Sequence, residues 1–171
     1  MESELKVGNP WTVLPIKNNK YARDLLEVHL SKRGLNKLEK FENFPNLEEI
    51  WLNDNKLINL DDISTNFRCK KVYCQNNMVE NINGLKKFKF LDTLLLGSNQ
   101  LRDLDKFLVE ITKFSFLKQL DLFGNPLAEE PDYRLKIIYL MPQVNVLDRH
   151  IVTVAERIRA KKICEEEYGL S

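Results

Sequence analysis

Apolar and polar residues alternate with a period of two in five short stretches of this chain, and the stretches recur at nearly constant spacing. This alternation predicts short β-strands that direct one face to an interior. In four stretches the strand pattern is followed by an asparagine and a further apolar residue. These stretches read LEEIWLNDNKL (47–57), CKKVYCQNNMV (69–79), LDTLLLGSNQL (91–101) and LKQLDLFGNPL (117–127).

A fifth stretch, LLEVHLSKRGL (25–35), comes first and has Arg33 in place of the asparagine. From Arg33 onward, the equivalent positions are 22, 22, 22 and 26 residues apart. A period of about 20–29 residues with this phrase is the signature of leucine-rich repeats. We therefore predict an α/β leucine-rich-repeat solenoid, with a short parallel sheet on its concave face, helical or 3-10 segments on its convex face and a helical C-terminal cap.

The asparagine of each phrase is expected to lie buried at the bend after the strand. There its amide can pair with backbone groups that a turning chain would otherwise leave without partners. The predicted asparagine ladder consists of Asn55, Asn77, Asn99 and Asn125.

The phrases divide the chain into an N-terminal extension (1–20), five repeats (21–128) and a C-terminal cap with a terminal helix (129–167). The extension contains Pro10 and Pro15. We expect it either to pack over the first repeat through Trp11, Val13 and Ile16 or to be a disordered tail.

The longer fourth repeat and the cap show helical patterns. In the repeat, Leu104, Phe107, Leu108 and Ile111 have helical spacing. In the cap, Pro131 suits the first turn of a helix that ends at Pro142, and 144–148 alternates like another strand. Thr153 and Glu156 form a capping box for a helix that can run through Glu167. The basic residues of that helix suit either a solvated face or an acidic partner.

Composition narrows the functional classes. Among 171 residues, 26 basic and 25 acidic side chains are interspersed, so a net charge of +1 makes direct nucleic-acid binding unlikely. No secretory or membrane-spanning segment is recognisable, and three cysteines without expected disulfides suit a reducing compartment. We thus expect a soluble, intracellular protein. The sequence offers no phosphate loop, nucleophile–base pairing or ligand cluster, so we predict a protein that is not an enzyme and needs no cofactor or metal.

The 22-residue repeats and the ending GNPLAEEPDYRLKIIYLMPQVNVLDRHIVTVAER (124–157) resemble leucine-rich-repeat proteins of the protein-phosphatase-1-regulator class. The resemblance covers about 22–160 and implies protein binding. Similar endings occur in axonemal proteins, in the spliceosomal A-prime proteins and in acidic nuclear phosphoproteins, whose long acidic tail is missing here. The stretch 30–57 and the LDRHIVTVAER ending favour an axonemal or other microtubule-based setting in the cytoplasm or cilium. The alternatives are a nuclear spliceosomal component that binds an RNA-recognition-domain partner, and a phosphatase regulator.

Partners are expected on the concave face, where the outward positions of the strands can be read from the phrases. Trp51, Tyr73 and Leu95 occupy the same position in consecutive repeats, so they should form one apolar patch. Alternatively, the aromatic residues brace one another or are covered by a chain terminus. The predicted partner-binding residues are His29, Glu49, Trp51, Asn53, Lys71, Tyr73, Gln75, Leu95, Asp121 and Phe123. We expect one or more protein partners within a larger assembly and no self-association. The abrupt end at Ser171 also suits a fragment of a longer chain.

Overall fold

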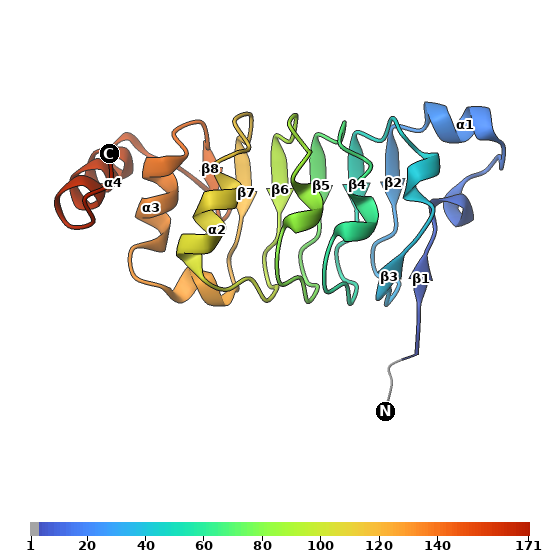
Figure 1. Cartoon of the computed structure of the whole chain (residues 1–171), viewed down its shortest axis with the longest axis horizontal. Helices are drawn as coiled ribbons and strands as arrows, with labels where there is room; N and C mark the ends of the chain where they lie inside the picture. The colour runs from blue at the N-terminus through green and yellow to red at the C-terminus, as the bar shows by residue number, and fades with distance from the viewer. Residues whose placement is uncertain (1–3) are drawn as a thin grey trace.

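In the computed structural model, which describes residues 4–171, each repeat contributes one strand to a continuous sheet (Figure 1). The strands follow one another in chain order, and neighbours are parallel except for the last two, which are antiparallel. The predicted leucine-rich-repeat solenoid is confirmed. Its sheet consists of β2 (Glu27–His29), β4 (Glu49–Trp51), β5 (Lys71–Tyr73), β6 (Thr93–Leu95), β7 (Gln119–Asp121), β8 (Val146–Leu147) and β9 (His150–Ile151).

Equivalent positions of successive repeats pair directly in the sheet. Ile50 pairs with Val72, and Val72 pairs with Leu94. These middle residues of the strands are buried in the interior, whereas both flanking residues of each strand point to the opposite face. The repeat period therefore places residues that are 22 or 26 positions apart side by side.

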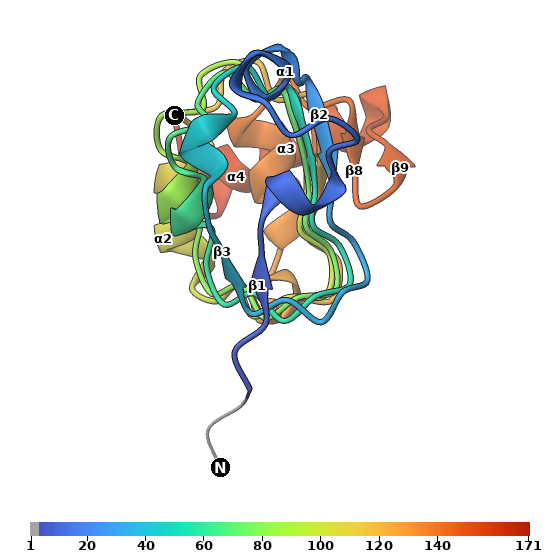
Figure 2. The ribbon, with the colours of Figure 1, turned by 90° about the vertical axis from the view of Figure 1, so that its right-hand side faces the viewer.

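The return segments cover the other side of the interior with short helices. Three repeats use 3-10 turns, η2 (Phe41–Asn43), η3 (Asp61–Ile63) and η4 (Asn83–Leu85). The longer fourth repeat forms α2 (Leu104–Ile111), and its four predicted apolar residues are buried. Figure 2 shows α2 on the side opposite the strands. Four additional residues provide the length for a true α-helix there.

The described part of the N-terminal extension packs on the first repeat. β1 (Val7–Gly8) pairs in parallel with β3 (Lys37–Leu38), and η1 (Pro10–Val13) and α1 (Asn19–Asp24) follow. The Trp11 ring meets Phe44 edge-on with centroids 5.1 Å apart. Ile16 is exposed, so its expected packing contact is wrong. The chain bends at Pro15 and Ile16 before α1 begins, and the Ile16 side chain lies on the surface.

The cap closes the last repeat with η5 (Pro126–Glu129), α3 (Tyr133–Leu140), β8, β9 and α4 (Val154–Glu166). α3 begins after Pro131 with Asp132 as its N-cap, and the Thr153–Glu156 capping box opens α4 as predicted. Among the basic residues of α4, Arg157 donates from Nη2 to Val144 O at 2.8 Å. Within residues 4–171, every helix is too short or too polar to cross a membrane.

Candidate protein-binding face of the sheet

Three side chains on the outward face of the sheet form a continuous stack. The rings of Trp51 and Tyr73 lie 3.8 Å apart between centroids, at an interplanar angle of 19°. His29 stacks on the other side of Trp51 at 5.1 Å. The parallel register imposes this arrangement, because β2, β4 and β5 hold these residues directly opposite one another. We call these three residues the aromatic stack. Leu95 continues the column next to Tyr73.

Charged side chains flank the aromatic stack on the side where the strands begin. Lys71 Nζ lies 3.9 Å from Glu49 Oε1, and His29 Nε2 lies 3.9 Å from Glu27 Oε2. Partial burial, and then the negative charge of Glu49, raises the pKa of Tyr73. The tyrosine hydroxyl therefore stays a neutral donor and acceptor at physiological pH.

On the other flank, small polar residues make contacts within the sheet face. Ser31 Oγ donates to Asn53 Oδ1 at 2.6 Å, and Asn53 Nδ2 donates to Asp54 Oδ2 at 2.7 Å. Among the described residues, Trp51 Nε1 and Gln75 Oε1 are buried without a hydrogen-bond partner.

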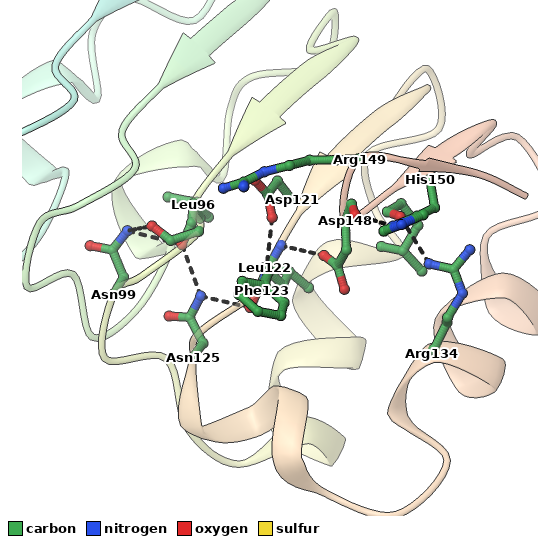
Figure 3. Close-up of polar contacts among 12 residues, drawn as sticks. Leu96, Asn99, Asp121, Leu122, Phe123, Asn125, Arg134, Asp148, Arg149 and His150 are labelled. Atoms are coloured by element: carbon green, nitrogen blue, oxygen red, sulfur yellow. Dashed lines mark hydrogen bonds and ion pairs between the residues drawn. The ribbon is translucent and has the colours of Figure 1, made fainter.

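Phe123 and Asp121 do not join the aromatic stack. The Phe123 side chain is 63% exposed and follows the end of β7, two repeats beyond Tyr73. Asp121, a predicted partner-binding residue, is only 3% exposed in the free protein. Arg149 reaches over Asp121, with Nε 3.2 Å from Oδ2 (Figure 3). Gly97 leaves room for this carboxylate, because a Cβ there would lie 3.0 Å from Asp121 Oδ2.

The turn between β8 and β9 places Arg149 over the face. Asp148 and Arg149 both have positive φ angles, 51° and 66°, which makes the hairpin tight. Asp148 Oδ1 accepts from Leu122 N at 2.7 Å, and burial raises the pKa of Asp148 despite this hydrogen bond. Neither residue belongs to a repeat phrase, so repeat spacing does not reveal them. Their only sequence signal is the pair of charges that interrupts the strand pattern at 148–149.

Arg134 and Glu156 anchor this hairpin from behind. Arg134 donates to Glu156 Oε1 at 2.7 Å and to Leu147 O at 2.8 Å. The hydrogen bond from Arg134 lowers the pKa of Glu156 to about 2. The carboxylate is therefore ionised at neutral pH, and its ion pair with Arg134 joins α3 to α4.

The asparagine amides connect successive repeats through shared backbone carbonyls. Leu52 O accepts from both Asn55 and Asn77, each at 2.9 Å. Cys74 O is shared in the same way by Asn77 and Asn99. Figure 3 shows Asn99 and Asn125 converging on Leu96 O. Each amide oxygen also accepts a backbone N–H of the preceding repeat, from Leu35, Leu57, Val79 or Leu101.

The face shows the chemistry of binding. Within residues 4–171, no group of three His, Cys, Asp or Glu side chains could hold a metal ion. Burial raises the pKa values of Cys69 and Cys74 to about 12, so these thiols are not activated nucleophiles. Stacked rings with charged neighbours instead suit contact with another macromolecule.

Comparisons with known proteins agree on the repeat class. The model of the family described as Leucine-rich repeat matches residues 14–170. U2 small nuclear ribonucleoprotein A' of Mycosarcoma maydis is 32% identical over 151 residues, which are 85% of this chain and 61% of that protein. The Homo sapiens protein of the same name is 30% identical over 155 residues, 87% of this chain and 60% of that protein.

A solved structure extends the similarity to three dimensions. A chain of the Drosophila melanogaster SNF/U2A' complex matches with a TM-score of 0.73 and 27% identity, covering 84% of this chain and 83% of that one. The chain spans only about three fifths of the length of the two curated relatives.

Proposed function

Because this chain belongs to the leucine-rich repeat family, we propose that it is a non-catalytic subunit of a nuclear ribonucleoprotein that binds a partner protein on the outward face of its sheet. The partner class is a protein with an RNA-recognition domain, as the resemblance to the A-prime proteins implies. Nuclear localisation is part of this proposal.

The observation that carries the proposal is the aromatic stack. Tryptophan and tyrosine dominate the binding energy of protein interfaces because they bury a large area at low entropic cost. Here both rings are held in one orientation by their neighbours, so little further ordering is needed on binding. The ion pair of Glu49 and Lys71 provides a polar rim.

The similarity to U2 small nuclear ribonucleoprotein A' supports the nuclear setting. It extends over the repeats and the cap, and the matching structure is that of a complex with a second protein, SNF. These findings favour the spliceosomal alternative over the axonemal setting that the sequence phrases favoured.

The experiment that tests this function is an affinity purification with the wild-type chain and a Trp51→Ala, Tyr73→Ala double variant, followed by mass spectrometry. We expect an RNA-recognition-domain protein to be recovered with the wild type and lost with the variant. Loss of two central aromatic anchors should weaken binding by about 2–4 kcal/mol. Titration calorimetry with the recovered partner measures this directly.

A matched control removes two exposed apolar side chains elsewhere, Ile58→Ala with Met78→Ala, and circular dichroism establishes that all variants are folded. Equal capture by wild type and the stack variant would overturn the binding face. Recovery of axonemal or tubulin-associated proteins, or of a phosphatase, would overturn the nuclear setting while leaving the binding face in place.

A further inference from the structure

The edge of the solenoid where the strands begin carries exposed aromatic rings in three consecutive repeats. It is the upper edge in Figure 1, where α1 leads into β2. Phe90 and Phe116, which precede β6 and β7, are each 56% exposed, and Phe67 before β5 is exposed as well. The rings of Phe90 and Phe116 are 6.4 Å apart between centroids, at an interplanar angle of 27°. We call the three segments 64–70, 86–92 and 112–118 the basic aromatic edge.

The charge of this edge differs sharply from that of the whole chain. Its segments contain seven basic side chains and a single carboxylate, Asp92, although the chain as a whole is nearly neutral. All seven are exposed, and within residues 4–171 only Lys70 forms an ion pair, with Glu48 at 3.4 Å. The basic residues are Arg68, Lys70, Lys86, Lys87, Lys89, Lys113 and Lys118.

Folding does not require the exposed rings. Phe88 and Phe114, two residues before Phe90 and Phe116, already supply the buried aromatic side chains of these segments. Phe90 and Phe116 therefore leave much of their apolar surface in water next to unpaired lysines. A pair of exposed rings among cations of which only Lys70 has an ionic partner within residues 4–171 needs an explanation outside the core.

We propose that the basic aromatic edge binds single-stranded nucleic acid. Exposed bases can stack on the rings of Phe90 and Phe116, while the surrounding lysines contact the phosphates. An acidic peptide would satisfy the charges but would gain nothing from the near-parallel orientation of two flat rings. A duplex would keep its bases inside its own stack. The near-neutral total charge argues against nucleic-acid binding by the whole surface, but it conceals this local concentration of positive charge.

The basic aromatic edge shares no residue with the aromatic stack, so failure of nucleic-acid binding would leave the proposed function in place, and the reverse also holds. The test measures fluorescence anisotropy of a labelled single-stranded oligouridylate of about twelve nucleotides. The variants are Phe90→Ala with Phe116→Ala, and Lys87→Glu with Lys89→Glu. Matched controls on the opposite edge are Ile58→Ala with Met78→Ala, and Lys37→Glu with Lys56→Glu.

We expect both edge variants to weaken binding about tenfold or more, and both controls to bind as the wild type does. Wild-type affinity should fall as salt rises from about 50 to about 200 mM, with a shallower salt slope for the lysine variant. A blunt duplex of the same length should bind more weakly.

Three outcomes would overturn the proposal: no salt-dependent binding by the wild type, equal loss in edge and control variants, or wild-type affinity in the phenylalanine variant. Binding of polyglutamate that equals the binding of RNA and does not depend on the rings would assign the edge to an acidic protein instead. Circular dichroism of each variant separates loss of binding from loss of fold.

Discussion

The guanidinium of Arg149 lies over the carboxylate of Asp121, joining the cap to the sheet face through a contact of 3.2 Å between Nε and Oδ2. The two residues are 28 positions apart, and the tight β8–β9 hairpin brings them together. Asp121 thereby ceases to be a surface charge. The column of outward residues that begins with the aromatic stack ends at this ion pair, so the proposed binding face is confined to the first four strands of the sheet.

Removing the Arg149 guanidinium should destabilise the protein, because Asp121 would stay buried without its cationic partner. We expect Arg149→Met, which keeps the side-chain stem, to lower the free energy of unfolding by about 1–3 kcal/mol in urea titrations. Arg159→Met, an exposed change within α4, should cost less than about 0.5 kcal/mol. Equal stability of the two variants would contradict a supporting role for Arg149.

The stacked rings of Trp51 and Tyr73 should be energetically coupled in the free protein. A double-mutant cycle with alanine at both positions, measured by urea unfolding, should give a coupling energy of about 0.5–1.5 kcal/mol. The same cycle for Trp51 and Phe123, which are three repeats apart, should give no coupling beyond experimental error. Coupling of equal size in both cycles would show that the contact between the Trp51 and Tyr73 rings contributes no stability of its own.

Loss of one repeat asparagine should be costly because it leaves buried backbone groups of two repeats without partners. Asn77→Ala removes hydrogen bonds to Leu52 O and Cys74 O and from Leu57 N. We expect it to lower the free energy of unfolding by about 1–3 kcal/mol. Arg33→Ala, at the equivalent but exposed position of the first repeat, should change it by less than about 0.5 kcal/mol. Comparable losses in both variants would contradict this account.

Stability should depend on pH through Glu156. Its pKa in the folded state is about 2, below the usual value of 4.5, so the carboxylate stabilises the fold above pH 4.5 and loses this contribution as pH falls toward 2. Because the side chain is 29% exposed, we expect Glu156→Gln to cost only about 1–2 kcal/mol at pH 7.

The difference between wild type and Glu156→Gln should shrink steadily between pH 4.5 and pH 2 in thermal or urea unfolding. Glu166→Gln, at an exposed position of the same helix, serves as the control. A difference that stays constant across this range would show that protonation of Glu156 does not govern acid sensitivity.

Local patterns in the sequence were sufficient to predict the repeats, the strand positions, α2, the capping box of α4 and the alignment of Trp51 with Tyr73. The reason is physical: in a solenoid each repeat contacts mainly its neighbours, so a fixed period converts sequence spacing directly into spatial register. The proposed setting among ribonucleoproteins could not be chosen from the same phrases, because similar endings occur in several classes of protein.

Contacts between the cap and the repeats required the folded structure. No period relates Arg149 to Asp121 or Arg134 to Glu156, since these pairs depend on how the hairpin and α4 close the last repeat. Phe90 and Phe116 occupy equivalent positions of successive repeats, so the period makes them neighbours, whereas their exposure and the angle of 27° between their rings required the folded structure. Contacts between successive repeats follow from the periodic sequence, whereas contacts between the cap and the repeats depend on tertiary packing.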